Sequence, residues 1–96
     1  MRYYAIMVEV TDLLIHTTES EAKLWGCFCT RYIQDNDIDS VLKKAKALVL
    51  SQLREEGILC VENQILIESV KEVDKLPGTA VDKGFTFYPI DEPKRH

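Results

Sequence analysis

The sequence predicts an α+β fold: a two-layer sandwich in which one main helix packs on a mostly antiparallel sheet of about four strands, in the order β-β-α-β-β. Two observations predict it. Apolar residues recur at steps of three and four between residues 38 and 53, as in a helix with one buried face. The segments on both sides of this helix alternate like strands or contain short apolar runs, so a sheet is the natural cover for the apolar face.

The first expected strand covers residues 2–10, where β-branched and aromatic residues are frequent. One face of this strand carries Tyr4, Ile6, Val8 and Val10, and the other carries Tyr3, Ala5, Met7 and Glu9. We expect the first set to face the core. Residues 11–23 are expected to form a long connection, although residues 13–15 are apolar enough to extend the strand instead.

Residues 24–34 are expected to form a central strand, because apolar side chains fall on both of its faces. One face carries Trp25, Cys27, Cys29 and Ile33, and the other carries Leu24, Phe28 and Tyr32. The pattern leaves open which of the two sets packs on the helix.

The helix is expected to begin after Asp37, whose side chain can accept a hydrogen bond from an unpaired amide of the first turn. Gly57 can adopt the left-handed conformation that ends a helix. Arg54 suits the negative end of the helix dipole, whereas Glu55 and Glu56 oppose it.

Residues 58–73 contain two apolar clusters and predict either one bent strand or two short strands. A turn is expected at residues 76–79, a last strand at residues 85–90 and a frayed tail at residues 91–96. Pro89 lacks an amide hydrogen and therefore puts the last strand at an edge of the sheet or at its own end. The order resembles half of a ferredoxin-like fold, without the second helix of that fold, and no specific family is suggested.

Composition narrows the class of protein. We expect a single domain over residues 1–96, because the chain is short and its 46% hydrophobic and 29% charged residues are typical of a globular protein. A net charge of −4 opposes binding to nucleic acid or anionic membranes and favours a basic partner. Free cysteines, no export signal and no long apolar run predict a cytoplasmic protein.

The sequence gives little support for a metal site. Cys27, Cys29, Cys60 and His16 are the only set able to supply four soft ligands, but a Cys-x-Cys pair on a strand lacks the usual zinc spacing, so we expect buried, inert thiols. The acidic cluster at residues 35–39 lacks the glycine and distal glutamate of a calcium loop and is expected to cap the helix. We therefore expect no metal and no cofactor.

The expected interaction surface follows from geometry. One helix, about 10 Å wide, cannot cover four strands spaced about 4.8 Å apart, and it leaves the second face of the sheet open. Contiguous apolar patches on soluble domains usually mark interfaces. We expect this face to carry Tyr3, Met7, Leu24, Phe28 and Tyr32, joined by Phe85 and Phe87 or, alternatively, by Tyr88. The six residues expected at the partner interface are Tyr3, Met7, Phe28, Tyr32, Phe85 and Phe87. The competing expectation is that residues 11–23 and the C-terminal tail fold over the face.

Two functional hypotheses result. The first is a small, non-catalytic module that binds a protein partner or a second copy of itself through the open sheet face or an edge strand, as an acidic inhibitor, immunity-type or regulatory protein would. The second is a small-molecule-binding or enzymatic domain with a site near His16, Arg31 and Tyr32. Convergence of His16, a cysteine and a carboxylate in one concave site would favour the second hypothesis.

Overall fold

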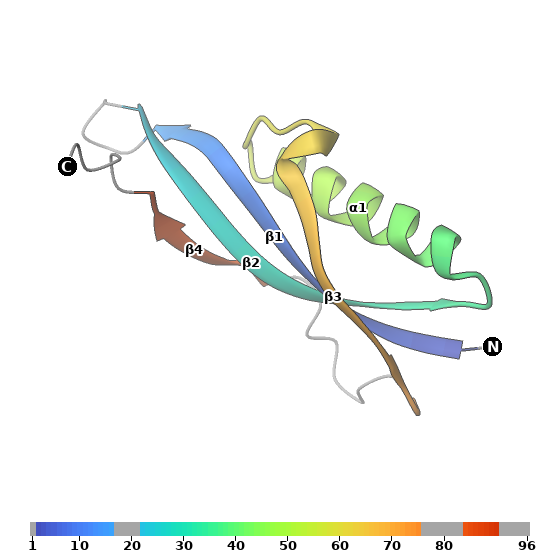
Figure 1. Cartoon of the computed structure of the whole chain (residues 1–96). Coiled ribbons are helices and arrows are strands. Elements are labelled where there is room, and N and C mark those ends of the chain that lie inside the picture. Colours follow the sequence, from blue (N-terminus) through green and yellow to red (C-terminus); the bar gives the residue numbers. More distant parts are fainter. Residues whose placement is uncertain (1, 17–21, 76–83, 91–96) are drawn as a thin grey trace.

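The computed structural model describes residues 2–16, 22–75 and 84–90. Its elements are β1 (Arg2–His16), β2 (Ala22–Asp35), α1 (Ile38–Glu55), a 3₁₀ turn η1 (Glu62–Gln64), β3 (Ile65–Val73) and β4 (Thr86–Pro89). The four strands form one open sheet in the order β3-β1-β2-β4, and all neighbours are antiparallel (Figure 1). This arrangement confirms the predicted α+β class and the β-β-α-β-β order.

The strands joined by α1 are not neighbours in the sheet. Both β2 and β3 pair antiparallel with β1, so they run parallel to each other with β1 between them. Such a connection must cross the sheet, and α1 does so on one face, where it contacts β1, β2 and β3 (Figure 1). The crossover therefore places the helix over the centre of the sheet.

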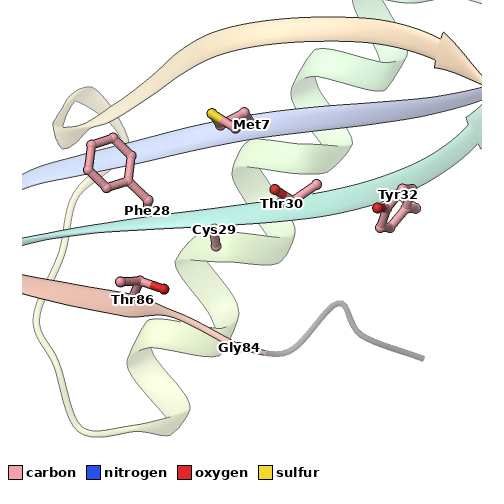
Figure 2. A pocket seen from close by; sticks show the side chains of 7 residues that line it. All are labelled: Met7, Phe28, Cys29, Thr30, Tyr32, Gly84 and Thr86. Carbon is pink, nitrogen blue, oxygen red and sulfur yellow. The ribbon is translucent and has the colours of Figure 1, made fainter. Parts of the chain in front are cut away.

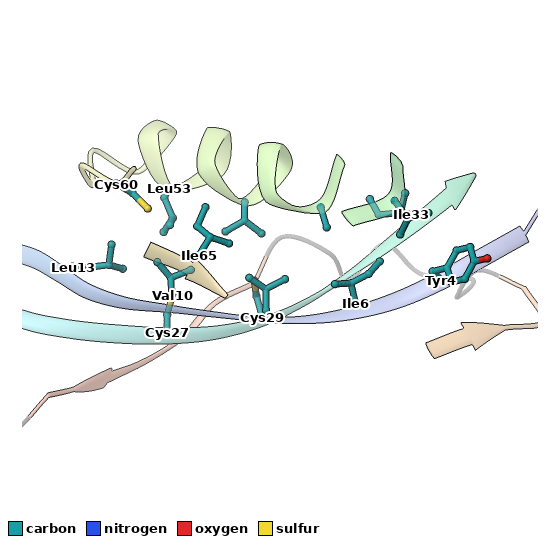
Figure 3. Packing of buried hydrophobic residues seen from close by; sticks show 14 residues of the cluster. Tyr4, Ile6, Val10, Leu13, Cys27, Cys29, Ile33, Leu53, Cys60 and Ile65 are labelled. Atoms are coloured by element: carbon teal, nitrogen blue, oxygen red, sulfur yellow. The ribbon is translucent and has the colours of Figure 1, made fainter. Parts of the chain in front are cut away.

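The core lies between α1 and this face of the sheet (Figure 3). The buried helix residues Val41, Ala45, Val49 and Leu53 follow the predicted helical spacing. They meet the predicted face of β1, which is Tyr4, Ile6, Val8 and Val10. On β2 the buried apolar residues are Cys27, Cys29 and Ile33, so the odd-numbered side chains of this strand face the helix. The set that packs on the helix is therefore the one that contains Cys27, Cys29 and Ile33.

β1 is longer than the sequence predicts. The long connection expected at residues 11–23 is wrong for the described residues 11–16, 22 and 23, which belong to strands. The strand continues to His16 through a bulge between Val10 and Leu13, and β2 already begins at Ala22. Asp12 has a φ of 60° in this bulge. The extra residue shifts the alternation by one, so that Leu13 is buried on the same side as Val10.

A distant glutamine supports the bulge. The Nε2 of Gln64, in η1, donates hydrogen bonds to the carbonyl oxygens of Thr11 at 3.1 Å and Asp12 at 2.9 Å. Its Oε1 accepts a hydrogen bond from the amide of Val61 at 2.9 Å. Because these partners are about fifty residues apart, local sequence alternation could not reveal the bulge.

The first apolar cluster after the helix is not a strand, so that part of the prediction is wrong. Gly57 ends α1 as expected, with a φ of 82°, and the Ile58 amide donates back to the carbonyl oxygen of Leu53 at 3.0 Å. The chain then runs through Cys60, which is buried, to η1, and only the second cluster forms β3. Residues 76–83 and 91–96, which include the expected turn and tail, lie outside the described residues.

The start of α1 is fixed by two aspartates. Asp37 is the N-cap, as predicted, and accepts a hydrogen bond from the Ser40 amide at 3.1 Å. The Asp35 carboxylate accepts hydrogen bonds from Ser40 Oγ at 2.8 Å and from the Asn36 amide at 2.6 Å, and it lies 2.7 Å from Lys44 Nζ. The ammonium group of Lys44 and these hydrogen bonds hold the pKa of Asp35 well below its usual value.

Asp35→Asn is expected to make the protein less sensitive to acid. Because folding lowers the pKa of Asp35, the ionised carboxylate stabilises the fold above its ordinary pKa of 3.8, and this stabilisation is lost as the pH falls further. Urea unfolding at about pH 7 and about pH 3 should show a larger loss of stability in the wild type than in the variant. Asp39→Asn, in the same turn, is the control; an equal pH dependence in the wild type and in Asp35→Asn would contradict the assignment.

Candidate functional site

The face of the sheet opposite α1 is the candidate site, and we call it the open face. Met7 pairs with Thr30, and Ala5 pairs with Tyr32, so these side chains share one face with Tyr3 and Phe28. Among the described residues no helix covers this face (Figure 2). Met7 is 44% exposed and Phe28 is 40% exposed. Four of the six residues expected at the interface, namely Tyr3, Met7, Phe28 and Tyr32, therefore lie together on the open face.

Phe85 and Phe87 lie on the helix side of the sheet. Phe87 pairs with Cys27, whose side chain is buried beneath α1. The ring of Phe85 packs against the guanidinium of Arg31, 4.8 Å from the ring centroid to Cζ. The alternative, Tyr88, pairs with Gly26 and lies on the open face. Alternation along the last strand puts Phe85 and Phe87 on one face and Tyr88 on the other. Which of these faces lies opposite α1 depends on the register of β4 against β2, and the sequence does not predict that register.

On the open face, Tyr88 of β4 contacts both β2 and β1. Its ring lies so close to Gly26 that a Cβ atom at that position would overlap it. The ring also packs against Phe28 with a centroid distance of 5.3 Å, and the hydroxyl donates a hydrogen bond to the Glu9 carboxylate on β1. This hydrogen bond, together with partial burial and the negative charge of Glu9, raises the pKa of Tyr88 to about 12.

A pair of carboxylates lies beside this tyrosine. The register of β3 shifts between the partners of Met7 and Val8, which makes Glu68 an extra residue in β3. Its carboxyl group lies within hydrogen-bonding reach of Glu9, and this contact is the main cause of the raised pKa of Glu68. This pair was not predicted from the sequence. The only available signal was one glutamate interrupting an apolar stretch in each strand.

A shallow groove of about 310 Å³ crosses the open face. Its lining includes Met7, Phe28, Thr30 and Tyr32, with Gly84 and Thr86 at the start of β4 (Figure 2). These residues come from three neighbouring strands, so the groove is a property of the sheet surface rather than of a loop. Its lining is mainly apolar and aromatic and includes the hydroxyl groups of Thr30, Tyr32 and Thr86, a combination that suits side chains of a protein partner.

A second hollow, of about 260 Å³, lies on the helix side and has an apolar lining of Ile15, Trp25, Ile58 and Phe87. It forms where the long β1–β2 hairpin extends past the C-terminal end of α1. Among the side chains that the structure describes, no charged group lines this hollow.

The three cysteines are free and buried, as expected. Burial raises the pKa of Cys27 to about 12 and also raises the pKa values of Cys29 and Cys60. A thiol with a raised pKa holds little thiolate at neutral pH and is a poor nucleophile. Within residues 2–16, 22–75 and 84–90, no three His, Cys, Asp or Glu side chains are arranged to hold a metal ion.

The thiols are expected to resist thiol–disulfide exchange in the folded protein. At about pH 8, an aromatic disulfide reagent should titrate almost no thiol under native conditions and all three cysteines in denaturant, because burial keeps them protonated and inaccessible. Rapid native reaction at any of the three would contradict the assignment. Cys→Ser variants, taken one at a time, would identify the reactive position.

The structure does not bring His16, Arg31 and Tyr32 together into the alternative site. Arg31 and Tyr32 are consecutive on β2, so their side chains lie on opposite faces of the sheet. The backbone of His16 pairs with Ala22 at the end of the hairpin, nine residues along β2 from Arg31, a separation of roughly 30 Å at 3.3 Å per residue.

Arg31 instead links three elements. Its side chain is fully buried, its Nε donates to Gln52 Oε1 on α1 at 2.8 Å, and its Nη1 donates to the carbonyl oxygens of Thr30 at 2.9 Å and Gly84 at 3.1 Å. These bonds join α1 and β2 to the residues that begin β4. Arg31 thus positions β4, and with it Tyr88, at the edge of the sheet.

Comparison of the chain with protein-family models, with curated proteins and with solved structures finds no match. In the part of the chain that the structure describes, no helix is both long enough and apolar enough to cross a membrane.

Proposed function

We propose that this protein is a small, non-catalytic module that binds a protein partner through its open face. The observation that carries the proposal is the set of large apolar side chains exposed on that one surface. This set is Met7, Leu14, Leu24, Phe28 and Leu66, with the rings of Tyr32 and Tyr88 beside it. Exposed apolar patches of this kind on soluble domains usually mark interaction sites.

The residue types on the open face and their packing support the proposal. Aromatic residues and methionine are enriched at the centres of protein interfaces because they bury a large area at a small entropic cost. The Phe28 and Tyr88 rings are already packed together, so binding would lose little of their freedom. The groove between Met7, Phe28 and Tyr32 supplies a recess for a partner side chain.

We favour the face over the outer edge of β3 as the contact. This edge carries the Glu68 bulge and the charged residues Lys71 and Glu72, and Glu72 forms an ion pair with Arg2 at 3.9 Å. Bulges and charges are the features by which edge strands avoid pairing with another chain. The negative net charge favours a basic partner and fits an acidic inhibitor, immunity-type or regulatory protein.

Phe28→Ser combined with Tyr32→Ser tests the proposal. The double variant should lose association with its partner, or with a second copy, while its melting temperature falls far less than that of a core variant, because both side chains lie on the surface of the monomer. Sedimentation at rising concentration and recovery of a stoichiometric partner from the native cell are the measurements. Leu59→Ser is the control, because Leu59 is 86% exposed but lies outside the open face.

Two results would contradict the proposal. A wild-type protein that stays monomeric and recovers no partner, with a double variant that is unfolded, would assign the rings to the core. Equal association of the wild type and a folded double variant would place the interface elsewhere.

A further inference from the structure

We propose that the open face binds a basic side chain of the protein partner, a lysine or an arginine, between the carboxylates of Glu9 and Glu68. This inference rests on the proposed function and adds the chemistry that the partner must present. The pair lies within the apolar surface, so recognition would combine one charge with apolar contacts.

The charges on the open face favour a basic group at this site. Glu9 and Glu68 come from neighbouring strands and lie side by side, and Asp12 adds a further negative charge near Tyr88. Among the described residues, the ion pairs are Arg2 with Glu72 and Lys44 with Asp35, so no lysine or arginine there neutralises Glu9 or Glu68. Two adjacent carboxylates repel each other, and a cation placed between them relieves that repulsion.

The side chains around the Glu9–Glu68 pair also suit a long basic residue. Glu9 lies directly opposite Phe28 on β2 and directly opposite Leu66 on β3. Phe28 is 40% exposed and Leu66 is 45% exposed. The aliphatic stem of a lysine or the flat guanidinium of an arginine packs well on such side chains while its charge reaches a carboxylate. The site therefore offers apolar contacts and negative charge to one long basic residue.

The same charges favour a basic protein over a second copy of this chain. In a two-fold dimer that packed this part of the open face against itself, the two Glu9–Glu68 pairs would approach each other. Like charges that meet in a partly desolvated interface cost free energy, and each chain already carries a net charge of −4. Charge complementarity therefore favours a basic protein over a second copy.

Binding of the basic group should depend on pH. The titratable groups that face the site are Glu9 on β1, Glu68 on β3, Tyr88 on β4 and Asp12 in the β1 bulge, whereas β2 contributes Phe28 and Gly26, which do not titrate. The raised pKa of Glu68 means that this carboxyl is protonated at a higher pH than usual. Affinity for a cation should therefore fall as the pH is lowered towards the ordinary value of 4.5.

Two synthetic peptides test the inference, one alternating leucine with arginine and one alternating leucine with glutamine. We expect the arginine peptide to shift the backbone amide NMR signals of Glu9, Phe28 and Leu66 and to bind about tenfold more tightly than the glutamine peptide. Glu9→Gln combined with Glu68→Gln should abolish this difference, because it removes both negative charges. The carboxamide at position 9 can still accept the hydrogen bond of Tyr88, so the position of Tyr88 should be kept. Glu55→Gln combined with Glu56→Gln removes the same charge at the end of α1 and should leave the difference unchanged.

The outcomes separate this inference from the proposed function. If both peptides shift the same amides with equal affinity, the open face binds apolar segments and the charged site is overturned while the proposed function stands. A tenfold preference that persists in the Glu9→Gln, Glu68→Gln variant also overturns it. If neither peptide shifts these amides in the folded wild type, the site is overturned, and the Phe28→Ser, Tyr32→Ser experiment decides the proposed function on its own.

Discussion

Val49→Asp is expected to unfold the protein. Val49 is fully buried at the centre of α1, where it faces the sheet within the cluster of Ile6, Val8 and Cys29. A carboxylate at this position loses its hydration and finds no partner, which typically costs several kcal/mol. Small domains have only about 5–15 kcal/mol of stability in total, so the variant should lose most or all of its cooperative unfolding transition.

Ala47→Asp is the matched control for this prediction. It introduces the same charge two residues earlier, on the exposed side of α1. Thermal melts followed by circular dichroism should show a transition near that of the wild type for Ala47→Asp and a lost or strongly lowered transition for Val49→Asp. A Val49→Asp protein that melts close to the wild type would mean that the helix is oriented differently.

Gly26→Ala is expected to displace Tyr88 from the open face. The added Cβ would overlap the hydroxyl end of the Tyr88 ring, so the ring must move to make room for it. The ring should then lose its packing on Phe28 and its hydrogen bond to Glu9, and forced repacking of this kind typically costs about 1–3 kcal/mol.

The readout for this variant is the titration of Tyr88. In the wild type its pKa is raised to about 12, and in Gly26→Ala it should fall towards the ordinary value of 10.0. Tyr88→Phe identifies the signal among the four tyrosines. Gly84→Ala is the control, because a Cβ at that position meets no other atom within 4 Å. An unchanged tyrosine titration and unchanged stability in Gly26→Ala would contradict the placement of Tyr88.

Local signals in the sequence predicted the helix and its ends correctly. The spacing of Val41, Ala45, Val49 and Leu53 defines a face within one continuous helix, and Asp37 and Gly57 act on backbone groups only a few residues away. The core face of β1 was also predictable as far as Val10, because strict alternation assigns it without knowledge of the partner strands.

Features that depend on distant contacts could not be predicted in this way. The bulge before Leu13 depends on Gln64, and the placement of Tyr88, rather than Phe85 and Phe87, on the open face depends on the offset of β4 against β2. The Glu9–Glu68 pair depends on a register shift in β3. Each of these features alters the candidate site, so the sequence predicted that a face would be open but not its chemistry.

The central claim is that the open face is the surface through which this protein acts. Site-specific photo-crosslinking in the native cell tests it most directly, with a photoreactive phenylalanine analogue placed at Phe28 on the open face or at Ala47 on the outer side of α1. The claim predicts one discrete adduct, with a basic protein, from position 28 and none from position 47. An adduct from position 47 alone, or the absence of any adduct from position 28 in a folded protein, would contradict it.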